Sequence, residues 1–192
     1  MKKILIASLL LIVGINSGWT QNKDFRNFSW GSPIEKVRAE EKAPFFSKLK
    51  NYELEYDDKL LGSNFKVLYI FNEKNKLISG IYIFSRKYSN SELYYQDYSV
   101  FLKLLSKKYG EPDKEKEVWN STDTEFDKTN KKQAIADGNL NLYSLWNTER
   151  TAVKITLISI GNEVPSLQIH YTSKSLDELQ DPIELKDAMN KL

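Results

Sequence analysis

The stretch that decides the fold of this chain is FKVLYIFNEKNKLISGIYIFS at residues 65–85. It contains two runs of aromatic and β-branched side chains, residues 65–71 and 77–85, separated by the polar residues 72–76. Such runs on either side of turn residues predict an antiparallel hairpin. In residues 65–71 the odd-numbered and the even-numbered side chains, which point to opposite faces of a strand, are both mostly apolar. This pattern predicts a central strand covered on both faces. Residues 52–56 add an earlier strand, so the first half of the chain is predicted to contain a meander.

Helix signals precede each set of strands. Ser32 is followed by Pro33 and Glu35, a pattern that predicts Ser32 as the N-cap of a helix that ends before Pro44. A longer helix is predicted from a cap at Asn90 or Ser91 to Gly110, where glycine accepts the left-handed backbone that ends a helix. The apolar side chains of this helix recur at helical spacing and are expected to face the core: Tyr94, Tyr98, Phe101, Leu102, Leu105 and Tyr109.

The second half of the chain partly repeats the first. Its strands are predicted at residues 117–120, 140–146, 152–160 and 166–172, with a polar loop after the first of them. The sequence LYSLWN at residues 142–147 resembles VLYIFN at residues 67–72, at an offset of 75 residues. Two diverged helix-plus-meander units, residues 28–88 and 89–175, would explain this match. Chance similarity between two ordinary hairpins is the alternative.

The predicted fold class is therefore α+β. Two helix-plus-antiparallel-meander units share a core, and a C-terminal helical segment follows at residues 176–192. Ser175 and Glu178 predict a capping box for this segment, and Asp181-Pro182 predicts a kink or a restart within it. Residues 21–192 are predicted to form a single domain, because about 170 residues suffice for one core.

The first twenty residues predict export. Lys2 and Lys3 precede an apolar run from Ile4 to Ile15, followed by small and polar residues, which is the order found in a secretory signal peptide. The apolar run is shorter than the roughly 20 residues that span a bilayer, so no membrane span is expected. Cleavage near residue 20 would leave a periplasmic or secreted protein. Loss of the two lysines would leave 26 basic and 26 acidic side chains, which argues against a nucleic-acid partner.

Several chemistries lack the residues they need. The chain has no cysteine, which excludes disulfides, a thiol nucleophile, a thiolate metal site and a lipid anchor on cysteine. His170 is the only histidine, so a multi-histidine metal site cannot form, and no serine lies in a Gly-x-Ser-x-Gly motif. The glycines are isolated and predict no phosphate loop. We therefore expect no cofactor, no metal and no enzymatic activity, with a carboxylate-based hydrolase as a remote alternative.

Two short motifs resemble a family. They are Trp30-Gly31-Ser32 with Val37, and Lys108-Tyr109-Gly110-Glu111-Pro112 followed by Trp119. Together they resemble exported bacterial α+β proteins built from helix-plus-antiparallel-sheet repeats, similar in fold to the beta-lactamase inhibitor protein and to small outer-membrane assembly lipoproteins. The resemblance implies a sheet surface used for protein contact. The chain lacks the inhibitor's cysteines and the lipidated cysteine of the lipoproteins, so no functional residue is carried across.

The last strand predicts where that contact surface lies. Leu167, Ile169 and Tyr171 alternate with polar residues, so one face of this strand is expected to meet solvent. Together with the neighbouring strands, this face predicts an interaction surface of Trp146, Lys154, Thr156, Gln168, His170 and Thr172. The predicted function is noncatalytic binding of another macromolecule, most simply a protein, as an adaptor or inhibitor. A small-ligand carrier with an apolar cleft between the two units is the alternative.

Overall fold

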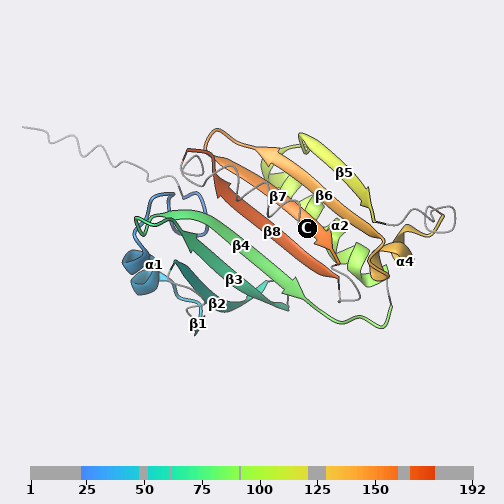
Figure 1. Cartoon of the computed structure of the whole chain (residues 1–192), viewed down its shortest axis with the longest axis horizontal. Helices are drawn as coiled ribbons and strands as arrows, with labels where there is room; N and C mark the ends of the chain where they lie inside the picture. Colours follow the sequence, from blue (N-terminus) through green and yellow to red (C-terminus); the bar gives the residue numbers. More distant parts are fainter. Residues whose placement is uncertain are drawn as a thin grey trace, which may run out of the picture.

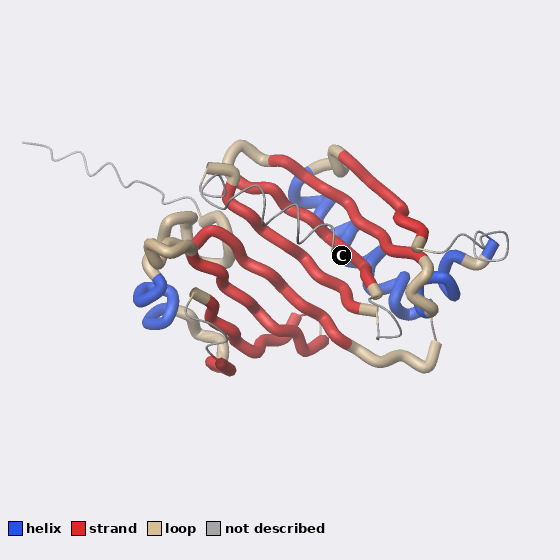
Figure 2. Tube along the Cα trace, viewed as in Figure 1, coloured by secondary structure: helices blue, strands red, loops and turns tan. Residues whose placement is uncertain are grey.

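The protein is an antiparallel β-sheet with helices on one face, as seen in a computed structural model (Figure 1). The structure describes residues 23–47, 52–60, 62–90, 92–120, 129–159 and 165–175. The predicted signal peptide and the C-terminal helical segment lie outside these residues. Figure 2 shows one continuous sheet in red and the helices in blue. No helix within the described ranges is both long enough and apolar enough to cross a membrane.

The first half of the chain contains the predicted helix and the three predicted strands, together with a short strand that was not predicted. A short helix is followed by four strands: α1 (Ile34–Glu40), β1 (Phe45–Ser47), β2 (Glu53–Leu60), β3 (Ser63–Phe71) and β4 (Leu77–Ser85). Ile34 and Val37 are buried as expected. The prediction of Ser32 as the N-cap is wrong, because Pro33 occupies that position and no side chain caps the helix.

The second half contains the long helix, four more strands and a helix that the sequence did not predict. These elements are α2 (Glu92–Tyr109), β5 (Lys114–Trp119), α4 (Lys131–Ala136), β6 (Leu140–Asn147), β7 (Thr151–Ile158) and β8 (Ser166–Ser173). The Asn90 side chain accepts a hydrogen bond from the backbone of Glu92 at 2.9 Å, and Gly110 ends α2 with a φ of 88°. Both features were predicted, whereas α4 lies in what was predicted to be loop.

All eight strands form one sheet, in the order β1-β2-β3-β4-β8-β7-β6-β5. The two halves meet where β4 pairs antiparallel with β8, from Ser79↔Thr172 to Ser85↔Ser166. One sheet therefore contains both predicted sets of strands. The sequence match equates β3 with β6, yet β3 is next to the central pair and β6 is one strand further out. The two-unit repeat stays a prediction.

The core lies on one face of this sheet. Along β3 the side chains of Phe65, Val67, Tyr69 and Phe71 are buried, and the residues between them are intermediate in burial. The prediction that β3 is covered on both faces is therefore wrong. Residues 23–40 cover one part of the buried face and α2 covers another. The buried side chains of α2 are Tyr94, Tyr98, Phe101 and Leu105, as predicted.

Phe25 anchors the N-terminal segment on this face. Its ring packs against the rings of Tyr69, Tyr82 and Tyr171 at centroid distances of 5.2, 5.1 and 5.3 Å. It fits there because Gly80 has no side chain, and a Cβ built at Gly80 would lie 2.1 Å from Phe25 Cδ1. The glycine thus provides the space in β4 that the aromatic ring fills.

We predict that Gly80→Ala destabilises the fold by about 1–3 kcal/mol, because the added methyl group overpacks the site. The free energy of unfolding in urea measures this loss. Phe25→Ala removes the clashing ring and costs about 3–5 kcal/mol by itself. In the Phe25→Ala background, Gly80→Ala should have little further effect. Equal costs of Gly80→Ala in the two backgrounds would contradict the proposed contact.

Candidate binding surface

The face of the sheet opposite α2 carries the candidate site, and we call it the open face. In β7 and β8 the register places Lys154 opposite His170 and Thr156 opposite Gln168 on this face. The neighbouring strands add Ile81 and Ile83 from β4, and Tyr143 and Leu145 from β6. No helix of the described chain packs on these positions; the contacts of α2 are with the buried face, as in the 4.7 Å ring contact of Phe101 with Phe84.

Five of the six predicted surface residues share the open face: Lys154, Thr156, Gln168, His170 and Thr172. The sixth, Trp146, does not, and its assignment to the surface is wrong. Trp146 is 2% exposed, and its indole Nε1 donates a hydrogen bond to the Gly110 carbonyl oxygen at 2.8 Å. Strand alternation explains the difference, because Trp146 pairs with the buried Val153 while the adjacent Leu145 pairs with Lys154.

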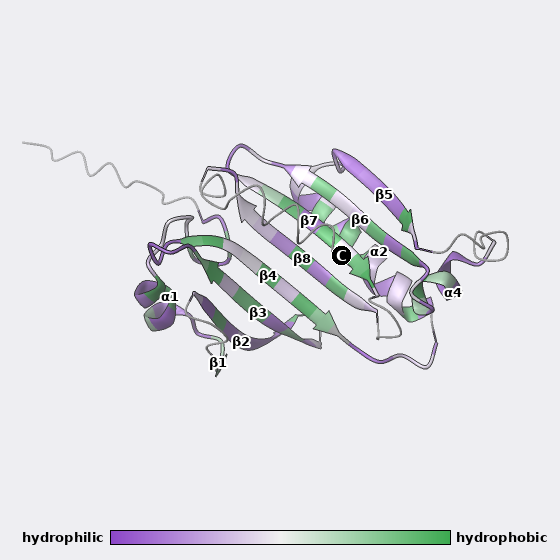
Figure 3. Cartoon of the chain, viewed as in Figure 1, coloured by the Kyte–Doolittle hydropathy of each residue, from purple (hydrophilic) through white to green (hydrophobic). Residues whose placement is uncertain are grey.

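The open face is more apolar than the sequence indicated. Ile81 and Ile83 lie directly opposite His170 and Gln168 across the β4–β8 pair. Leu68 lies beside Ile81 in turn. The sequence predicted residues 65–71 to be covered on both faces, which would have placed Leu68 in the core, and it did not predict the faces of Ile81 and Ile83. All three are intermediate in burial. Figure 3 shows this mixture of hydrophobic and hydrophilic residues along β3, β4 and β8.

His170 is held neutral at the centre of the open face. Burial and, to a smaller extent, the positive charge of Lys154 lower its pKa to about 4. The imidazole Nε2 lies 2.9 Å from the side-chain oxygen of Gln168. In the tautomer that carries a proton on Nε2, the ring donates this hydrogen bond. A neutral imidazole bound in this way is a fixed donor and does not attract anions itself.

Two polar groups beside His170 have no partner within the described part of the chain. Lys154 has no carboxylate within ion-pair distance, and desolvation lowers its pKa. Its side chain is exposed overall, so the lowering reflects the flanking sheet residues and not full burial. Thr156 is 7% exposed, and its hydroxyl makes no hydrogen bond. A buried hydroxyl without a partner is unfavourable by about 1–3 kcal/mol.

Charge is distributed unequally across the open face. Strands β5 to β8 place Lys114, Lys116 and Lys154 on it and no carboxylate. On the other half, Lys66 Nζ lies 2.5 Å from Glu55 Oε1 and 3.3 Å from Asp57 Oδ1. The charge of Lys66 is therefore already compensated, whereas that of Lys154 is not. The half of the face over β5 to β8 is the electropositive one.

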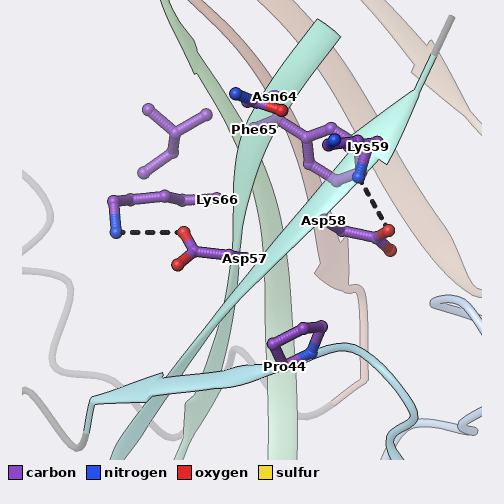
Figure 4. Close-up of a pocket in the computed structure, with 8 residues that line it drawn as sticks. Pro44, Asp57, Asp58, Lys59, Asn64, Phe65 and Lys66 are labelled. Atoms are coloured by element: carbon purple, nitrogen blue, oxygen red, sulfur yellow. Dashed lines mark hydrogen bonds and ion pairs between the residues drawn. The ribbon is translucent and has the colours of Figure 1, made fainter. Parts of the chain in front are cut away.

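Two cavities bear on the carrier hypothesis. The larger, about 660 Å³, lies at the edge of the first half of the sheet, where Asp57, Lys59 and Lys66 surround Phe65 (Figure 4). The smaller lies between the halves, where Phe84 of β4 meets Leu167 of β8, and measures about 10 Å³. A volume of this size holds about one water molecule. The larger cavity thus lies away from the junction where the carrier hypothesis places a cleft.

A buried ionic cluster on the opposite face fixes the N-terminal segment. Arg26 contacts Glu41 at 3.1 Å and Asp58 at 2.7 Å, and the Tyr69 hydroxyl donates a hydrogen bond to Glu41. The side chain of Glu41 is 3% exposed. Burial and the hydrogen bond to Glu41 raise the pKa of Tyr69. Each charged group here has a partner, so the cluster is structural in character and offers no free group to a ligand.

Comparisons with known proteins identify no relative: no family model matches the chain, and neither the curated proteins nor the solved structures include a similar one. Within the described ranges, no group of three or more histidine, aspartate or glutamate side chains is placed to hold a metal ion. The open face is thus assigned from its own geometry. It offers apolar contact area, a neutral imidazole and an uncompensated ammonium group.

We predict that Arg26→Met destabilises the fold by about 3–5 kcal/mol, because it leaves the buried Glu41 carboxylate without its ion partner. Chemical denaturation measures the change. Lys131→Met is the matched control, since Lys131 pairs with Glu117 at 2.7 Å but both side chains are about half exposed. That exposed pair should contribute less than about 1 kcal/mol. A similar loss for both variants would contradict the structural role of the cluster.

The single histidine makes the predicted pKa of about 4 directly measurable. In an NMR titration, the imidazole resonances of His170 should change near pH 4 and not near pH 6.5. The imidazole of the unfolded chain takes up its proton near pH 6.5, whereas that of the folded chain does so only near pH 4. The free energy of unfolding should therefore fall as the pH drops from 6.5 towards 4. His170→Gln should lack this part of the pH dependence. A transition near 6.5 would show that the open face does not bury the ring.

Proposed function

We propose that this chain is an exported, noncatalytic protein that binds another protein through the open face of its sheet. The observation that carries the proposal is the group formed by Lys154, Thr156 and His170. Beside a desolvated neutral imidazole lie an ammonium group and a hydroxyl that have no partner among the residues that the structure describes. Such groups gain hydrogen bonds and charge pairing when a partner covers them. Export is the part of the proposal that rests on the signal-like residues 1–20.

The size and composition of the face support a protein partner. Eight strands at a spacing of about 4.8 Å span about 34 Å, and a strand of eight residues extends about 27 Å. The face thus covers up to about 900 Å², comparable to the roughly 800 Å² that each side of a standard interface buries. Ile81, Ile83 and Leu145 supply apolar contacts around the polar centre. Apolar contacts surrounding a few desolvated polar groups are typical of the centre of a protein interface.

The charge of the face specifies the partner further. Lys114, Lys116 and Lys154 lie over β5 to β8, and these four strands place no carboxylate on the open face. The partner surface should therefore combine apolar side chains with acidic ones, because a cation buried without a counter-charge would oppose binding. An origin from two diverged units is proposed on the sequence match alone, LYSLWN at residues 142–147 with VLYIFN at residues 67–72.

A photoreactive amino acid at Thr172 tests the proposal in the native host. Thr172 lies on the open face, and Lys103, exposed on α2, is the control position. We expect a discrete protein adduct from position 172 and none from position 103. Adding Lys154→Glu should reduce that adduct about tenfold, equivalent to about 1.4 kcal/mol. No adduct from position 172, or equal adducts from both positions, would refute the proposed surface.

A further inference from the structure

The described chain ends just after β8, beside the β6–β7 turn. β8 ends at Ser173, and Lys174 is held beside the β6–β7 turn by hydrogen bonds to Arg150 at 3.0 Å and to Thr148 at 3.0 Å. The 17 residues at 176–192 follow from this point. We infer that residues 176–192 bind the open face of their own chain, over β7 and β8.

Charge complementarity supports this occupant. Residues 176–192 contain five acidic side chains and two lysines: Asp177, Glu178, Asp181, Glu184, Asp187, Lys186 and Lys191. They would meet the half of the open face that carries Lys114, Lys116 and Lys154 and no carboxylate. Lys154 has no ion partner in the described chain, so a carboxylate from the segment would compensate a charge that is otherwise uncompensated. The other half of the face, where Glu55 and Asp57 already pair with Lys66, would repel the segment.

The apolar pattern of the segment matches the face. After Asp181 and Pro182, which favour a helix start, apolar side chains recur at i, i+3, i+4 and i+7. They are Leu185, Ala188, Met189 and Leu192. A helix with this stripe needs an apolar surface to bury it, because a short helix is marginal by itself in water. Ile81, Ile83 and Leu145 on the open face supply such a surface.

The length of the segment also fits. Seventeen residues in helical form extend about 25 Å, and the eight residues of β8 extend about 27 Å. A segment that turns back after Ser175 would therefore pass Thr172, His170 and Gln168 in order. Because it is tethered, its effective concentration at the face reaches the millimolar range. If the face binds a protein as proposed above, the segment competes with that partner and regulates access; only this consequence rests on the proposed function.

The absence of cysteine permits a direct test on the full chain. Met189→Cys carries a nitroxide spin label, and paramagnetic broadening is measured at backbone amides. We expect at least a twofold loss of peak intensity at Thr156, Gln168 and His170, and a much smaller loss at Val100 and Leu104 on the exposed side of α2. The same label at Val100→Cys is the matched control and should reverse this pattern.

Lys154→Glu in the Met189→Cys chain should largely restore the peak intensities of the open face, because the segment then meets a like charge. Lys103→Glu on α2 should not. The inference is overturned if the label at position 189 leaves the open face unaffected, or broadens both faces equally. It is also overturned if a nitroxide on one chain broadens the amides of a second chain that carries no nitroxide, since the occupant would then be a second copy. A photo-crosslinked partner at Thr172 without intramolecular broadening would uphold the proposed function and refute this inference alone.

Discussion

The antiparallel pairing of β4 with β8 is the interaction on which the rest of the structure depends. It joins Ser79 to Thr172 and Ser85 to Ser166, so strands more than 80 residues apart in the chain become neighbours. Without this pairing, each half would have an unpaired strand edge with exposed backbone groups. With it, the two halves share one sheet and one core, and Phe25 from the N-terminal segment contacts Tyr171 from the last strand.

The two faces of that sheet differ in how their polar groups are satisfied. On the covered face, Arg26 pairs with Glu41 and Asp58, and the Tyr98 and Ser144 hydroxyls share a hydrogen bond of 2.9 Å. On the open face, Lys154 lacks a counter-charge and the Thr156 hydroxyl lacks a partner among the described residues. Buried hydroxyls without a partner in the described chain occur on both faces, Tyr56 on the covered face and Thr156 on the open face, so the contrast lies in the charged groups. Charged groups in a core must be paired for the chain to fold, whereas those on a binding surface are paired by what binds there. This contrast is the main reason for assigning function to the open face.

Local patterns in the sequence predicted the elements well where one periodicity dominated. The stripe of α2 and its ending at Gly110 were predicted because helical spacing and capping are encoded within a few residues. The alternation of β8 likewise identified Gln168, His170 and Thr172 as sharing a face. Prediction failed where the pattern was ambiguous: β3 is apolar at both parities, so its partly exposed side could not be identified. The short helix α4 was missed because its Asn130 cap lies within a run of polar residues.

The sequence by itself determined the α+β composition, the order of most helices and strands, and the side of β8 that avoids the core. These properties depend on neighbours a few residues apart. Only the tertiary structure decided that both strand sets form a single sheet, that Trp146 points into the core, and that Ile81 and Ile83 flank His170. Pairing between distant strands sets these relations, because a strand's own alternation defines two faces but not which neighbours it meets. The candidate surface is thus a product of register across the β4–β8 pair.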